Sequence, residues 1–203
     1  MEHNRSVIEH IDKFAWQGFL DACKSDNLII VKFLVENSYG INSIKNKNGF
    51  LHTCLTGNLE ITKILFENNC GIDQINKWGR NGFLYACENN NFEIVKFLFK
   101  NNCGINQIDY RGKNGFISSC DNGNLDIVQF LFENNCGIHQ IDKYGKNGFI
   151  YVCGDNFYGT YHGEIIMFLY ESGYFPSLSN EMVLPFSRRW FCAALEKKLI
   201  FKN

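Results

Sequence analysis

Cysteine and histidine are the residue types of this chain whose side chains most readily bind metals or act as nucleophiles. The 203-residue sequence holds nine cysteines, and its five histidines are His3, His10, His52, His139 and His162. Zinc sites use Cys or His pairs that typically lie about two to four residues apart. The sequence contains no Cys-x-x-Cys pair, no Gly-x-Ser-x-Gly, no His-Glu-x-x-His and no phosphate-binding loop. We therefore predict no catalytic residue, no metal site and no cofactor.

The cysteines fall into two regular series. The first series follows a Phe by four residues each time: Cys23, Cys54, Cys87, Cys120 and Cys153. The second series recurs every 33 residues: Cys70, Cys103 and Cys136. Cys is a small apolar residue that is often buried, so we interpret both series as packing positions between helices.

The interval of 33 residues extends through most of the sequence. The tripeptide Asn-Gly-Phe begins at Asn48, Asn81, Asn114 and Asn147, and Gln17-Gly18-Phe19 is a further copy. A fixed interval of this length is typical of repeat architectures, in which each unit buries its apolar face against the next unit.

One complete unit extends from Asp109 to Ile141. Asn114 is a good helix N-cap and predicts a short helix over about 115–121, which breaks at Asn122-Gly123. A second, strongly apolar helix is expected over about 125–132. It ends at Asn134-Asn135 and Gly137, which are suitable C-cap residues.

Two runs of the sequence resemble a known repeat family. Asp142–Phe149 lies over the D-x-x-G-x-T-P-L of the ankyrin repeat, and Asn58–Asp73 lies over its H-L-E-V-V-K-L-L-L-E-x-G-A-D-V-N. The resemblance implies an all-α ankyrin solenoid of about five 33-residue helix–turn–helix units, with hairpin-finger loops and a C-terminal capping helix. The expected divisions are a partial N-terminal repeat or cap at 1–11, repeats at 12–44, 45–75, 76–108, 109–141 and 142–175 with an insertion at 154–163, and a helical cap at 176–203.

The repeats depart from the family pattern at the start of the first helix. Asn replaces the family's Thr as N-cap, and Gly replaces its Pro, so the preorganised backbone of Pro is lost. Leu or Ile replaces the family's His. We therefore expect moderate stability, with a melting temperature below about 90 °C.

Charge and composition disfavour several classes of protein. The formal net charge of −1 argues against a globally basic nucleic-acid binder or a polybasic membrane anchor. No uninterrupted apolar stretch approaches the length of a membrane span, and residues 1–14 lack the apolar core of a signal peptide. We expect a monomeric cytoplasmic protein whose cysteines are reduced.

The resemblance also implies a function. Ankyrin arrays bind other proteins through a concave face formed by the finger tips and the first helices, and we expect a non-enzymatic interaction module with an acidic-rimmed, apolar-centred partner. By register, the predicted partner-binding residues are Lys77, Trp78, Arg80, Glu88, Tyr110, Arg111, Lys113, Asp121, Lys143, Tyr144 and Lys146. Aromatic residues and Arg are the residue types enriched among interface hot spots.

Two other functions are compatible with the sequence. Some viral ankyrin proteins end in a short helical segment with a Leu-Pro opening that recruits a ubiquitin ligase, and Leu184-Pro185 is a weak match to it. Basic and aromatic finger tips are also compatible with nucleic-acid binding. The Asn-rich, divergent repeats look like those of ankyrin proteins from giant DNA viruses of amoebae, which makes a host protein the expected partner.

Overall fold

The computed structural model describes residues 17–37, 48–153 and 162–174 of the chain, and these residues contain helices and turns but no strand. The expected partial repeat at 1–11, the C-terminal cap at 176–203 with Leu184-Pro185, and most of the insertion at 154–163 lie outside the described residues. The fold of the described residues is the all-α ankyrin-repeat fold that the sequence predicts.

The chain divides into two compact units, one extending to Tyr110 and the other starting at Arg111. The first unit contains a helix over 17–24 and then α2 (Leu28–Glu36), α4 (Gly49–Thr56), α5 (Leu59–Glu67), α6 (Gly82–Glu88) and α7 (Phe92–Lys100). The second unit contains α8 (Gly115–Asn122), α9 (Leu125–Glu133), α10 (Gly148–Cys153) and α11 (Gly163–Glu171).

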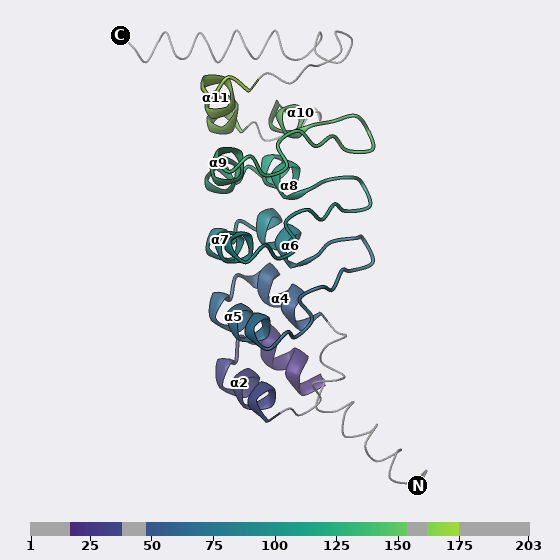
Figure 1. Cartoon of the computed structure of the whole chain (residues 1–203), viewed down its shortest axis with the longest axis vertical. Coiled ribbons are helices and arrows are strands. Elements are labelled where there is room, and N and C mark those ends of the chain that lie inside the picture. Colours follow the sequence, from purple (N-terminus) through teal and green to yellow (C-terminus); the bar gives the residue numbers. More distant parts are fainter. Residues whose placement is uncertain (1–16, 38–47, 154–161, 175–203) are drawn as a thin grey trace, which may run out of the picture. The chain divides into compact units, whose positions relative to one another are not determined.

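Each unit is built from helix pairs that stack on one another (Figure 1). In the first unit α4 packs against α5 and α6 packs against α7, while α4 stacks on α6 and α2 stacks on α5. In the second unit α8 packs against α9 and α10 against α11, while α8 stacks on α10 and α9 on α11. First helices therefore lie beside first helices and second helices beside second helices, as in a repeat stack.

Asparagine residues mark the start of α8 and the end of α9. The Asn114 side chain accepts a hydrogen bond from the Ile117 N–H at 2.9 Å, which confirms it as the N-cap of α8. Asn135 has a φ of 50°, and the Cys136 N–H donates to the Leu131 carbonyl at 2.8 Å. This left-handed residue with its backward hydrogen bond is a Schellman-type end for α9. The two predicted helices of this repeat are therefore confirmed.

The Asn caps also tie each first helix to the loop that follows the second helix. Asn81 Oδ1 accepts from the Leu84 N–H at 3.0 Å, while Asn81 Nδ2 donates to the Gly104 carbonyl at 2.8 Å. Asn114 makes the equivalent bond to Gly137 at 2.7 Å. Since both Asn81 and Asn114 are buried, these bonds satisfy polar groups that would otherwise destabilise the fold.

A large aromatic residue packs against a glycine where first helices meet. Phe50 is 2% exposed and lies against Gly82 of the next repeat in the first unit. A Cβ atom on Gly82 would approach Phe50 Cε1 to 2.7 Å and Cys54 Sγ to 2.9 Å. The Gly that replaces the Pro of the family pattern therefore has a packing role that the sequence does not show. It leaves room for the ring of Phe50.

The first cysteine series is a core series. Cys23, Cys54, Cys87 and Cys120 are completely buried, as expected. Burial raises the pKa of Cys23 to about 12 and the pKa of Cys153 to about 11. The second series is less uniform, because Cys70 is buried whereas Cys103 and Cys136 are half-buried. All eight described cysteines are free thiols.

Candidate functional site

Each finger loop is a turn that one side chain closes through hydrogen bonds to the backbone. In the first unit, Asn76 Oδ1 accepts from the backbone N–H groups of Trp78 and Arg80, at 2.8 Å and 3.0 Å. In the second unit, Asp142 Oδ1 accepts from the N–H groups of Tyr144 and Lys146 in the same way, at 2.9 Å and 2.8 Å. Asn and Asp side chains are well suited to closing turns of this kind. The residues at each finger tip therefore have a defined orientation.

Hydrogen bonds also join consecutive fingers within each unit. In the first unit the Tyr110 N–H donates to the Trp78 carbonyl at 2.9 Å, and Gln107 Nε2 donates to the Gly79 carbonyl at 2.8 Å. In the second unit Gln140 Nε2 donates to the Gly112 carbonyl at 3.1 Å. Neighbouring fingers thus form one connected layer rather than separate loops.

The finger layer of the first unit presents large apolar side chains to solvent. The exposed fractions are 51% for Ile75, 53% for Trp78, 46% for Ile108 and 60% for Tyr110. We call these four residues the apolar finger surface. In the second unit, Ile141 and Tyr144 are exposed by 58% and 64%. An exposed cluster of large apolar side chains is typical of an interaction site.

Sequence reasoning identified the aromatic residues of this surface but missed its isoleucines. Ile75, Ile108 and Ile141 recur every 33 residues, immediately before the Asn or Asp that closes the finger turn. This repeated apolar residue next to a turn was an available signal. The recurrence places one exposed Ile close to the exposed aromatic residue of each finger.

Arg80 was predicted to be a partner-binding cation, and its guanidinium is engaged within the chain. Arg80 Nη1 lies 2.8 Å from Glu88 Oε2, and Arg80 Nε lies 3.8 Å from Asp109 Oδ2. Asp109 is only 7% exposed. Both Arg80 and the predicted acidic residue Glu88 therefore have a structural role in holding the finger against α6.

Lys113 differs most from its predicted place at a finger tip. It is 8% exposed, its ammonium lies 2.7 Å from Asp121 Oδ2, and it sits 4.1 Å above the centre of the Tyr151 ring. Burial and a hydrogen bond to Asp142 raise the pKa of Tyr151, so this ring stays neutral beside the cation. Lys113 is thus buried and paired with the carboxylate of Asp121, whose side chain is exposed.

The remaining predicted cations do reach solvent. Lys77, Arg111 and Lys143 are exposed, and Lys146 is partly exposed. Lys77 Nζ lies 4.5 Å from the centre of the Trp78 ring, a distance typical of a cation–π contact. The first unit therefore has an apolar finger surface with one cation at its edge rather than a broad basic stripe.

The described residues contain no group of three or more His, Cys, Asp or Glu side chains that is arranged to hold a metal ion. Burial raises the pKa values of the thiols of Cys23, Cys54 and Cys120, and a neutral buried thiol is a poor nucleophile. The exposed finger residues are aromatic, aliphatic and basic side chains, a set suited to contact with another molecule.

Comparison with known proteins supports this interpretation for the central part of the chain. Residues 50–144 match the family model described as ankyrin repeats, in three copies. Ankyrin repeats are generally protein–protein interaction modules, and the family is typically non-enzymatic. No curated protein matches the chain. Among the described residues, no helix has the length and apolar character needed to cross a membrane.

Proposed function

We propose that this chain is a non-enzymatic interaction module that binds a partner protein through the apolar finger surface of its first unit. The observation that carries the proposal is the exposure of Ile75, Trp78, Ile108 and Tyr110 on two fingers that backbone and side-chain hydrogen bonds join together. Large rigid side chains that are already held in place lose little conformational freedom on binding.

The chemistry of the surface defines the partner. Trp and Tyr are prominent among the residues that dominate binding energy, and they act from well-packed apolar contacts. Arg80 and Glu88 compensate each other at 2.8 Å, so the exposed positive charge beside the surface comes from Lys77 and from Arg111, which follows Tyr110 in the chain. The partner that fits is a protein with an apolar ridge and an acidic residue beside it. The compositional resemblance to giant-virus proteins makes a host protein the first partner to test.

The second unit carries a finger of the same chemistry. Ile141 and Tyr144 are exposed, and Lys143 lies next to Tyr144. This finger therefore has the same kinds of exposed side chain as the apolar finger surface.

Affinity capture with a triple variant tests the proposal. Tagged wild type is compared with a chain carrying Trp78→Ala, Tyr110→Ala and Tyr144→Ala, after circular dichroism has established that both fold alike. Removing hot-spot aromatics weakens binding by roughly 100-fold or more, so the partner is expected on the wild type and absent from the variant.

A matched control uses a different exposed apolar residue. Ile29 is 81% exposed and lies in α2, outside the finger layer, so Ile29→Ala is expected to retain the partner. A partner retained equally by wild type and the triple variant would contradict the proposed surface. The binding residues would then be sought outside the described part of the chain, including the C-terminal segment with Leu184-Pro185.

A further inference from the structure

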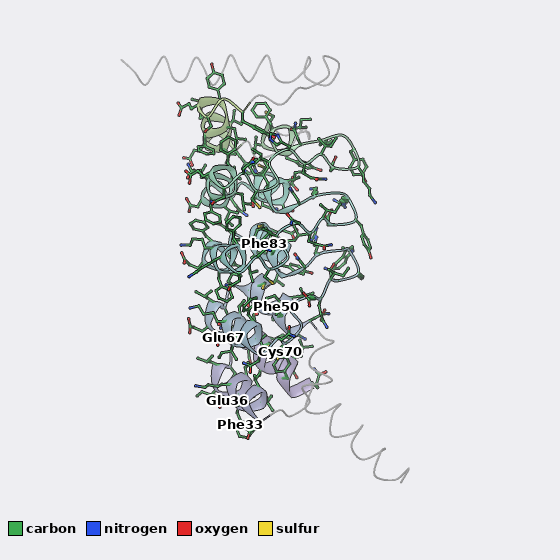
Figure 2. All side chains as sticks on the ribbon, viewed as in Figure 1. Phe33, Glu36, Phe50, Glu67, Cys70 and Phe83 are labelled. Atoms are coloured by element: carbon green, nitrogen blue, oxygen red, sulfur yellow. The ribbon has the colours of Figure 1, made fainter. Side chains whose placement is uncertain are left out.

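The apolar finger surface lies on loops and not on helices. Figure 2 shows the finger between Cys70 and Phe83 extending away from the helices of the first unit. A segment that stands outside the core has little buried apolar area, so its order depends on local polar contacts. The hydrogen bonds between fingers therefore decide how Trp78 is oriented relative to Tyr110.

The next finger holds the backbone beside Trp78 in three ways. The Tyr110 N–H donates to the Trp78 carbonyl at 2.9 Å, and Gln107 Nε2 donates to the Gly79 carbonyl at 2.8 Å. The Tyr110 ring lies against Gly79, since a Cβ atom on Gly79 would approach Tyr110 Cδ1 to 2.7 Å. The two exposed aromatic residues of this surface therefore come from fingers that are in direct contact.

Gln107 bonds to the backbone of both fingers through a single nitrogen. The nitrogen of a primary amide carries two N–H donors. Gln107 Nε2 uses them for the Gly79 carbonyl at 2.8 Å and for the Ile108 carbonyl of its own finger at 2.9 Å. Gly79 follows Trp78 in the chain, and Ile108 belongs to the apolar finger surface. One half-buried side chain thus fixes the backbone at two residues of this surface relative to each other.

The second unit contains the same arrangement. Gln140 Nε2 donates to the Gly112 carbonyl at 3.1 Å and to the Ile141 carbonyl at 2.8 Å. The Lys143 N–H donates to the Arg111 carbonyl at 2.8 Å, as the equivalent residue of the first unit does. Because the forked bond occurs with the same residue type at both junctions, it is a regular part of how these fingers are joined.

We propose that Gln107 is the positioning residue of the apolar finger surface. It holds Trp78 in a fixed relation to Ile108 and Tyr110 before the partner binds, and it raises affinity without adding an apolar contact of its own. Groups that are ordered in advance lose less conformational freedom on binding. The inference rests on the proposed function, because it assigns Gln107 a role in the same binding surface.

Amide hydrogen exchange of the full chain, followed by NMR, tests the positioning role without a partner. Gln107→Met keeps the length of the side chain and removes both donors. The Tyr110 amide is expected to exchange about tenfold faster in this variant, whereas the Lys143 amide is unchanged. Gln140→Met is the matched control and is expected to give the reverse pattern. The amide of Leu98, in the core of α7, is expected to stay unchanged in both variants.

The indole N–H of Trp78 reports the order of the ring itself. Its heteronuclear NOE is expected to fall in Gln107→Met and to stay unchanged in Gln140→Met. The chain has three tryptophans, and the loss of one signal in Trp78→Phe assigns the resonance. An unchanged Tyr110 exchange rate and an unchanged NOE in Gln107→Met would overturn the proposal. Exchange that accelerates equally at Tyr110 and Leu98 would also overturn it, because Gln107 would then contribute to the stability of the whole fold.

Titration of the captured partner separates this inference from the proposed function. Gln107→Met is expected to lower the affinity by about fivefold, and Gln107→Glu, which has nearly the same shape but no N–H donor, is expected to lower it as well. Faster Tyr110 exchange with unchanged affinity would overturn the inference alone. A partner that the triple variant also retains would overturn the proposed surface and this inference together.

Discussion

The ring of Phe50 occupies the space that a side chain would need at Gly82. A Cβ atom there would come within 2.7 Å of the ring, well inside van der Waals contact. The same relationship holds between Phe19 and Gly49 and between Phe116 and Gly148, at 2.6 Å in each case. The Gly that replaces the family's Pro in these repeats is therefore matched by a large Phe in the neighbouring repeat, and the ring of this Phe fills the space beside the Gly.

This pairing predicts the effect of adding one methyl group. Gly82→Ala should destabilise the fold by about 1–3 kcal/mol, because overpacking forces the ring or the helix to move. Urea unfolding monitored by circular dichroism measures the free energy of unfolding. Gly18→Ala is the control, since nothing lies within 4 Å of its added Cβ and Gly18 is also near the start of a first helix. The control should change stability by less than about 1 kcal/mol.

A double variant distinguishes overpacking against the Phe50 ring from the effect that a Gly-to-Ala change has on the helix backbone. Phe50→Leu removes the part of the ring that meets Gly82, so Gly82→Ala should cost less in a Phe50→Leu background than in wild type. A coupling energy near zero between the two substitutions would contradict the packing explanation.

Removing the side chain of Arg80 should lower the stability of the fold more than removing the side chain of Lys77. Arg80→Ala should lower stability by about 1–2 kcal/mol, because it removes the cation beside Glu88 and the largely buried Asp109. Lys77→Ala should leave stability within about 0.5 kcal/mol, because Lys77 is exposed. Thermal unfolding of the two variants compares them directly. Equal stability of both variants would mean that the Arg80 contacts contribute nothing measurable to folding.

Partner binding should depend only weakly on salt. The finger cations Arg80 and Lys113 are engaged by carboxylates of the chain, and the four residues of the apolar finger surface are uncharged. Between about 50 and about 200 mM salt, affinity should change by less than about tenfold, whereas binding through several phosphate contacts would fall by about 10³-fold or more. Titration of the captured partner at the two salt concentrations measures this change in affinity. A steep loss would favour the nucleic-acid alternative.

Alkaline pH should destabilise the fold through the buried thiols. The pKa of Cys23 rises from 9.0 to about 12 on burial, so its folded form stays protonated when its unfolded form has ionised. The stability contributed by this raised pKa is fully present below about pH 9 and is lost as the pH rises towards 12, by about 1.4 kcal/mol per pH unit. Urea unfolding with reductant from about pH 8 to about pH 11 measures the slope. Cys23→Ala should give a shallower slope, and an unchanged slope would exclude this thiol as a cause.

The fold was predictable because its signals are local and repeated. The 33-residue interval located the repeats, Asn114 and Asn122-Gly123 located the two ends of α8, and Asn134-Asn135 located the end of α9. These features depend on residues close together in the sequence. The register of the ankyrin resemblance placed Trp78, Tyr110 and Tyr144 at finger tips, and the structure shows that all three are exposed.

The features that sequence reasoning missed depend on how close two segments come in space. Arg80 and Lys113 looked like surface cations because their partners Glu88 and Asp121 lie eight residues away on a helix whose direction the sequence leaves open. Gly82 looked like a weakened helix start because the ring of Phe50 comes from the previous repeat. Charge counts and helix propensities describe single residues and contain no information on such distances.

The Phe–Gly pairing has a consequence for how the array changes in length. The two partners are the same at each of the three junctions described, so a repeat that offers Phe on one side and Gly on the other fits a copy of itself. Duplicating or deleting a 33-residue segment between two Asn-Gly-Phe tripeptides leaves every new junction with a matching ring and gap. Recombination between neighbouring repeats of the gene can therefore lengthen or shorten the array, and with it the number of fingers, without a compensating substitution in the core.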